Sequence, residues 1–237
     1  MGAVTGTTSV EPDAPSFYDE LVAELETRRA ALPPDGGGSF FNRPMTEHEL
    51  VEWLSFQAYY ELRAAQFIGR WLSNTPERDA FVLLAQQVED EGLHYEYCMR
   101  ALERRGITSI DTWKPEPEWE EWIDRWYPSG TDTIERVSAH NLAGELGACN
   151  AFVEIRTRVP DDVLKALERI IPDEHFHMRI AKNLVDKYAV SEDQRGRVRA
   201  RVLATFDLEQ AGRIAYNRRM VTLGIADPGD PVPPLPG

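Results

Sequence analysis

The chain has 237 residues, 42% of them hydrophobic, which is enough for one sizeable core in an ordinary globular domain. Its formal net charge of −14 argues against a broad surface for nucleic acid or anionic membranes. Two cysteines are too few for a disulfide framework, a zinc ribbon or a cysteine-ligated iron–sulfur cluster. Because there is also no signal-peptide pattern and no apolar run near the roughly 20 residues of a membrane span, we expect a cytoplasmic protein.

Apolar residues recur at helical spacing along most of the chain, and no stretch has the pattern of a strand. A capping box at Thr46, Pro76 in a first turn, and Gly106 and Gly224 after last turns mark helix ends. Pro172 predicts a kink or a π-bulge inside its helix. The predicted helices cover residues 16–32, 46–73, 76–105, 132–159, 160–189 and 191–223, with a short one near 116–126.

These helices predict a single all-α domain over residues 16–224. Two antiparallel helix pairs joined by the long connection 107–131 form a four-helix bundle with one crossover. An additional helix precedes the bundle, and a fifth helix follows it. The small polar residues of 1–15 and the proline-rich tail 225–237 are expected to be disordered.

Two Glu-x-x-His motifs occur, one on the predicted helix 76–105 and one on the helix 160–189. Their three-residue spacing places both side chains on one helical face. A lone glutamate lies on the helix before each motif, 30 residues upstream in the first half of the chain and 29 in the second. The six side chains of this repeat are Glu61, Glu91, His94, Glu145, Glu174 and His177.

The lengths of the helix pairs place these glutamates at matching heights. From Glu61 the chain runs 13 residues to the turn, and 15 residues then lead from Pro76 to Glu91. At the α-helical rise of about 1.5 Å per residue, the chain travels about 20 Å along the first helix to the turn and about 22 Å back along the second. The second pair has 14 residues in each direction. The four glutamates and two histidines should therefore meet at one level of the bundle.

Glu61 and Glu145 lie in largely apolar stretches, so we expect their carboxylates to be buried. A buried carboxylate must be paired or bind a metal, which disfavours the alternative that these are solvated helix faces. Four carboxylates and two imidazoles balance the charge of two divalent ions and offer oxygen and nitrogen ligands suited to iron or manganese. A structural zinc would require a closed tetrahedral set instead.

Over roughly residues 46–189 this pattern resembles the ferritin-like non-haem di-iron carboxylate proteins. The resemblance implies two iron ions, with Mn/Fe and Mn/Mn pairs as alternatives. It makes Glu91 and Glu174 bridging ligands and gives each metal one imidazole. Glu61 and Glu145 are then mainly terminal ligands.

In the oxygenase branches of this family, the aspartate before each Glu-x-x-His accepts a hydrogen bond from the ligand histidine of the opposing motif. The resemblance therefore implies that Asp90 supports His177 and that Asp173 supports His94. The alternative is that both aspartates occupy ordinary solvated helix positions.

The resemblance also implies an oxidoreductase of the di-iron monooxygenase or oxidase type. Such an enzyme activates dioxygen and hydroxylates, epoxidises or N-oxygenates a small organic substrate, with electrons from a separate donor protein. A manganese catalase or a ferroxidase remains the alternative, and a non-catalytic bundle that binds partners is a third. Residues 222–228 are similar to the segment after the bundle in catalytic subunits of phenylacetyl-CoA epoxidase, a match too short to name a substrate.

Four further residues are expected near the cluster. Cys98 and Cys149 each follow a ligand by four residues, so both should point toward the metal cavity and line it as small side chains. A redox-active or proton-handling side chain, as the resemblance implies for these positions, is the alternative. Asn141 either reaches the cavity or supports the core, and Phe152 either lines an apolar pocket or packs in the core.

The fifth helix is locally basic, with seven arginines against four acidic residues over 191–223. A solvated face or a face buried in a homodimer is the common role of such a helix. A site for a phosphate-bearing substrate or for an electron-transfer partner is the alternative.

Overall fold

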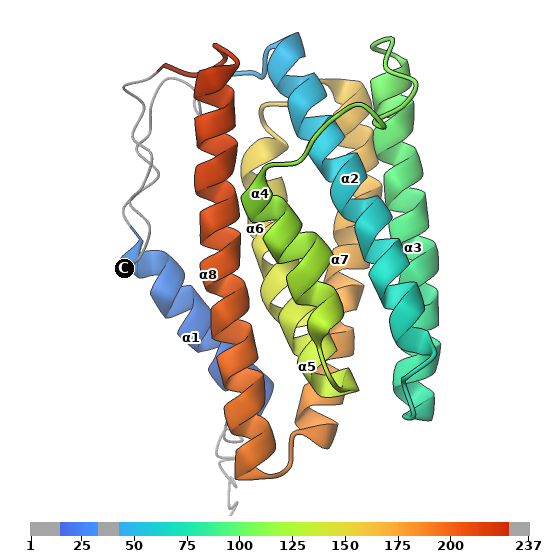
Figure 1. Cartoon of the computed structure of the whole chain (residues 1–237), viewed down its shortest axis with the longest axis vertical. Helices are drawn as coiled ribbons and strands as arrows, with labels where there is room; N and C mark the ends of the chain where they lie inside the picture. The colour runs from blue at the N-terminus through green and yellow to red at the C-terminus, as the bar shows by residue number, and fades with distance from the viewer. Residues whose placement is uncertain (1–14, 33–42, 228–237) are drawn as a thin grey trace, which may run out of the picture.

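The computed structural model describes residues 15–32 and 43–227. This part of the chain is helical and contains no strand, which confirms the all-α prediction (Figure 1). The terminal segments expected to be disordered fall mostly outside the described residues. Over the same ranges, no helix combines the length and apolar character needed to cross a membrane.

The helices follow the predicted order, with changes at some boundaries. They are α1 (Phe17–Ala31), α2 (Glu47–Leu72), α3 (Arg78–Glu103), α4 (Pro117–Trp119), a π-helix (Glu120–Trp126), a 3₁₀-helix (Tyr127–Ser129), α5 (Thr133–Val137), a second π-helix (Ser138–Gly144), α6 (Glu145–Ile155), α7 (Asp161–Tyr188) and α8 (Glu192–Thr222).

The N-terminus of α2 shows how a tertiary contact changes a predicted cap. The Thr46 side chain accepts a hydrogen bond from the backbone N–H of Glu49, as expected for an N-cap. The Glu49 carboxylate does not complete the capping box, because it pairs with Arg43 and Arg158 instead. Half of the predicted box therefore forms.

The helix predicted over residues 132–159 is divided into α5, the π-helical segment Ser138–Gly144 and α6. Of the two alternatives predicted at Pro172, a kink or a π-bulge, the π-bulge is absent, since α7 continues through that residue as an α-helix. Pro172 is exposed, so water can satisfy the carbonyl group that loses its helical partner. The unusual turns lie instead directly before Glu145, where an extra residue per turn alters which side chains face the interior.

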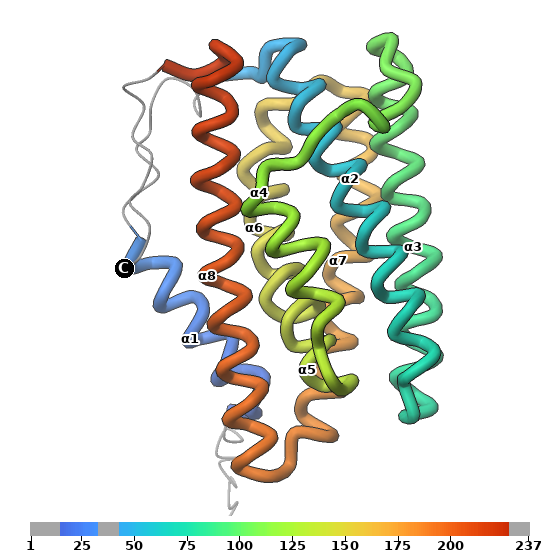
Figure 2. The backbone as a smooth tube through the Cα atoms, viewed as in Figure 1, coloured from blue at the N-terminus to red at the C-terminus, as the bar shows by residue number. Residues whose placement is uncertain are grey.

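Helices α2 and α3 form one antiparallel pair, and α7 packs against α3, α6 and the second π-helix (Figure 1). The backbone trace shows α8 outside this group, where it contacts the second π-helix and the α4 region (Figure 2). Helix α1 crosses α7 and α8. The interior between α2, α3, α6 and α7 is thereby shielded on the α8 side by an additional helix.

Candidate metal centre

Six buried polar side chains meet between α2, α3, α7 and the start of α6, and none is more than 2% exposed. They form two groups of three, and within each group one potential ligand atom per residue lies within 4.8 Å of the others. The structure thus brings together the whole predicted repeat. The groups are Glu61, His94 and Glu174, and Glu91, Glu145 and His177.

The Nδ1 atom of His94 faces three carboxylates. It lies 3.4 Å from an oxygen of Glu174, 3.5 Å from Glu91 and 3.9 Å from Glu61. This nitrogen has no hydrogen-bond partner among the described residues. A buried ring nitrogen surrounded by carboxylate oxygens has the environment of a metal ligand.

The Nδ1 atom of His177 has the matching environment on the other side. It lies 3.1 Å from Glu174, 3.3 Å from Glu145 and 3.6 Å from Glu91. Glu91 and Glu174 therefore approach both imidazoles, whereas Glu145 approaches only the imidazole of His177. That difference is what bridging and terminal carboxylates require.

The Nε2 atoms of the two histidines point toward the aspartates that precede the opposing motif. His94 Nε2 lies 3.2 Å from Asp173, and His177 Nε2 lies 3.3 Å from Asp90. The crossed pairing expected from the sequence is therefore present. A hydrogen bond donated from Nε2 leaves the lone pair on Nδ1, which is the nitrogen that faces the carboxylates.

We expect Asp90→Ala and Asp173→Ala each to weaken metal affinity about 10- to 100-fold, because each frees a ligand imidazole to rotate or change tautomer. Competition with a metallochromic chelator measures the affinity, and circular dichroism checks that the helices persist. Glu89→Ala, at an exposed position next to Asp90, is the matched control and should leave affinity unchanged. Unchanged affinity in both aspartate variants would show that these residues are only solvated helix positions.

The carboxyl groups of the cluster have opposite pKa shifts. Burial and the neighbouring carboxylates raise the pKa values of Glu61 and Glu145 well above the usual range. Burial opposes ionisation of Glu91 and Glu174 as well, but the adjacent histidines outweigh it and lower both pKa values. The histidines thus favour ionisation of the two acids that contact both imidazoles, whereas burial beside other carboxylates opposes ionisation of Glu61 and Glu145.

The histidines supply the balancing positive charge. Burial alone would lower the pKa of His94, yet its contacts with Glu91, Glu174 and Asp173 raise it to about 9. The pKa of His177 is likewise raised, because Glu91 and other carboxylates outweigh the effect of burial. Divalent ions bound here would take over this charge balance and release protons from the cluster.

Gln87 is a polar member of the site that the sequence interpretation missed. It is fully buried, and its Nε2 donates hydrogen bonds to Glu91 at 2.8 Å and to Glu145 at 3.1 Å. Its Oε1 accepts a hydrogen bond from Asn141 Nδ2, which also lies 3.4 Å from the backbone oxygen of His177. The available signal was its position four residues before Glu91, which puts both side chains on one face of α3.

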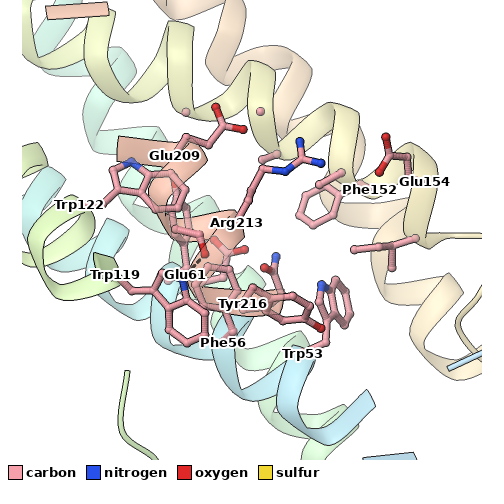
Figure 3. Close-up of a pocket in the computed structure, with 18 of the residues that line it drawn as sticks. Trp53, Phe56, Glu61, Trp119, Trp122, Phe152, Glu154, Glu209, Arg213 and Tyr216 are labelled. Atoms are coloured by element: carbon pink, nitrogen blue, oxygen red, sulfur yellow. Dashed lines mark hydrogen bonds between the residues drawn. The ribbon is translucent and has the colours of Figure 1, made fainter. Parts of the chain in front are cut away.

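A cavity of about 500 Å³ adjoins the cluster and is lined by the carboxylates Glu61 and Glu174 (Figure 3). This volume is within the range that holds small organic ligands. Most of its remaining wall is apolar, so a bound molecule would contact both the carboxylates and apolar side chains. The aromatic lining comprises Trp53, Phe56, Tyr60, Trp119, Trp122, Phe152 and Tyr216.

Only Phe152 of the four predicted pocket residues lines this cavity. Cys98 is buried in an apolar cluster, and Cys149 has its Sγ 3.8 Å from the Sδ of Met178. Asn141 supports the core through Gln87. Neither cysteine lines this cavity, which lies between the cluster and α8. Both are near the cluster all the same, since burial together with Glu61 raises the pKa of the Cys98 thiol, and burial together with Glu174 and Glu145 raises that of Cys149.

The basic residues of α8 serve mainly as internal ion-pair partners. Arg199 pairs with Glu20 and Glu24 of α1, at 3.4 and 3.1 Å. Arg218 pairs with Glu116 and Glu118 near α4, at 3.2 and 2.9 Å. The local excess of arginine therefore attaches α8 to acidic neighbours, a contact pattern that the charge count alone did not specify.

The arrangement offers two adjacent groups of oxygen and nitrogen donors beside a cavity of organic-ligand size. Such a site can hold two divalent ions and expose them to a bound molecule on one side. Comparisons with protein-family models, with curated proteins and with solved structures find no match to this chain.

Proposed function

We propose that this protein is a ferritin-like non-haem di-iron oxygenase that uses dioxygen to oxidise a small organic substrate. The observation that carries the proposal is that the two buried Glu/His groups directly adjoin an aromatic cavity. Glu61 and Glu174 belong to one of these groups and also line the cavity. A site that only stored metal would not need an organic-sized cavity lined by its own ligand carboxylates.

The donor set fits two ferrous ions. Glu91 and Glu174 would bridge them, because each contacts both histidines, and Glu61 and Glu145 would each bind one. The unpartnered Nδ1 of His94 supports the same assignment. Bound ferrous ions would supply the electrons that activate dioxygen, and Mn/Fe or Mn/Mn pairs are the alternative contents.

The chain's own residues organise the reaction around that pair. The crossed aspartates hold the imidazoles in one tautomer, and Gln87 keeps Glu91 and Glu145 oriented by donating to both. The aromatic lining would limit the water around a bound substrate and hold that substrate against Glu61 and Glu174, which line the same cavity. Electrons for repeated turnover would come from a separate donor protein.

The test is an anaerobic Fe(II) loading followed by a pulse of ¹⁸O₂, with and without candidate organic substrates and a chemical reductant. We expect the right substrate to accelerate oxygen consumption and to acquire ¹⁸O or lose a pair of hydrogens. Ala151→Phe adds bulk at a cavity-lining position of α6. It should suppress the acceleration of oxygen consumption by the substrate and leave the metal content unchanged.

Two results would replace the proposal. Rapid disproportionation of hydrogen peroxide by the manganese-loaded protein, without coupled oxidation in the iron form, would identify a catalase. Repeated conversion of added Fe(II) into ferric mineral, with no effect of any organic substrate, would identify a ferroxidase.

A further inference from the structure

One wall of the cavity comes from α8, the helix that contributes no member of the six-residue cluster. Glu209, Gly212, Arg213 and Tyr216 line the cavity at spacings of three and four residues, so they lie on one face of α8 (Figure 3). The side chains of this wall affect which molecules the cavity can bind, independently of any bound metal ions.

Glu209 is a buried carboxylate with incomplete hydrogen bonding. The residue is 6% exposed, and its Oε2 has no hydrogen-bond partner among the described residues. Its Oε1 lies 3.5 Å from Nη2 of Arg29, which is longer than a good charge-assisted hydrogen bond. A buried carboxylate left in this state is destabilising unless something else supplies a donor.

The backbone makes room for this carboxylate. A Cβ atom at Gly147, on the facing helix α6, would lie 2.5 Å from Oε1 of Glu209. Glycine at this position therefore allows the carboxylate to lie directly against α6, beside the cavity. Gly147 and Glu209 both line the cavity, so the carboxylate occupies the space beside the glycine at the cavity's edge.

Glu209 differs from the other acids that line the cavity. Glu61 and Glu174 belong to the metal cluster, and Glu154 is exposed. Burial raises the pKa of Glu209, while the positive charges of Arg29 and Arg213 oppose that shift. Arg213 already has an interaction partner in the structure, so among the cavity-lining residues of α8 the buried atom without a hydrogen-bond partner is Oε2 of Glu209. Elsewhere in the lining, the Tyr60 hydroxyl and Trp122 Nε1 are also unpartnered among the described residues.

Three aromatic residues that line the same cavity as Glu209 can contact a cation. The Phe56 and Trp119 ring centroids lie 4.6 Å apart, and the Tyr216 centroid lies 6.5 Å from the first and 6.3 Å from the second. Aromatic faces attract ammonium groups, and their edges and faces also pack against a flat apolar molecule. The wall therefore combines a carboxylate acceptor with surfaces that tolerate positive charge.

We propose that the cavity binds a small aryl or alkyl amine whose ammonium group donates hydrogen bonds to Glu209 and whose apolar body packs on the aromatic wall. As the substrate class of the enzyme this rests on the proposed function, because only a loaded metal pair would oxidise the bound molecule. As a binding site it concerns Glu209 and its neighbours alone.

Isothermal titration calorimetry of the full-length protein, both metal-free and Mn(II)-loaded, tests the binding site with three probes of similar size: tryptamine, tryptophol and indole-3-propionate. We expect tryptamine to bind about 10- to 100-fold more tightly than the alcohol, as a hydrogen bond to a buried charge implies. The carboxylate probe should bind most weakly. Glu209→Gln should remove the preference for the amine.

Two further variants separate recognition from general damage. Gly147→Ala should displace the Glu209 carboxylate and reduce the amine preference, although it changes no charge. Asp207→Asn removes an exposed charge two residues away on α8 and should preserve the ranking of the three probes. If Glu209→Gln does not fold, the ranking by the wild-type protein together with Gly147→Ala still decides the question.

Equal or tighter binding of the alcohol or of indole-3-propionate by the wild-type protein would overturn the amine assignment. Metal content, measured on the same samples, keeps the two proposals apart. A protein that prefers the amine but holds no metal pair contradicts the oxygenase proposal alone. One that holds two metals and shows no amine preference contradicts this inference alone.

Discussion

Glu91→Ala and Glu174→Ala should each leave the protein with little of the two metal ions per chain that we expect in the Fe(II)-loaded wild type. Each of these carboxylates contacts both histidines, so removing one takes a ligand from both metals at once. Glu61→Ala and Glu145→Ala remove a ligand from one side and should retain more metal than the bridging variants. Elemental analysis after anaerobic loading and desalting gives the stoichiometry.

The matched control for these variants is Glu96→Ala, which removes an exposed glutamate of α3 that pairs with Arg100. It should hold as much metal as the wild type. Retention of both metals by Glu91→Ala, or a single tightly bound zinc in fully loaded wild-type protein, would contradict the dinuclear assignment. Circular dichroism distinguishes loss of ligands from loss of fold.

The largest effect on stability is expected at Glu49, which is fully buried between two arginines. One of its oxygens pairs with Arg158, and the other lies 2.8 Å from Nη1 of Arg43. Glu49→Ala would leave both guanidinium groups without this buried counter-charge, and we expect the free energy of unfolding to fall by about 3–5 kcal/mol. Urea unfolding followed by circular dichroism measures the change.

Glu47→Gln provides the comparison within the same helical turn. Glu47 pairs with Arg105 but is mostly exposed, so its loss should change stability by at most about 1 kcal/mol. Similar small effects of both substitutions would show that Glu49 is not required to neutralise the arginines. Because Arg158 also lines the cavity, Glu49→Ala should in addition weaken ligand binding there.

The ligand cluster could be predicted because helices impose a fixed geometry on sequence spacing. Glu91 and His94 must share a face of α3, and the similar lengths of α2 and α3 bring Glu61 to the same height. The crossed contacts of Asp90 and Asp173 were instead implied by the resemblance to di-iron oxygenases. The placement of the glutamates and histidines depends on local periodicity and helix length, which the sequence contains directly.

Other parts of the site depend on contacts between distant elements. Gln87 belongs to no recognisable motif, and its role becomes evident only when Glu145 approaches it from another helix. The π-helical turns before Glu145 could not be predicted from apolar spacing, because that spacing was read with the 3.6 residues per turn of an α-helix. Cys98 and Cys149 lie near cluster carboxylates but do not line the cavity, because the packing of α8 determines where the cavity lies.

Helix α8 lines the cavity but contributes nothing to the two groups of potential metal ligands. Its cavity face includes Gly212, Arg213 and Tyr216, none of which belongs to the two ligand groups. A library randomised at these three positions would alter the shape and polarity of the cavity without replacing a metal ligand. If the proposed function holds, α8 is therefore a unit in which ligand preference could diversify, in protein engineering and in evolution alike, while the six clustered side chains stay constant.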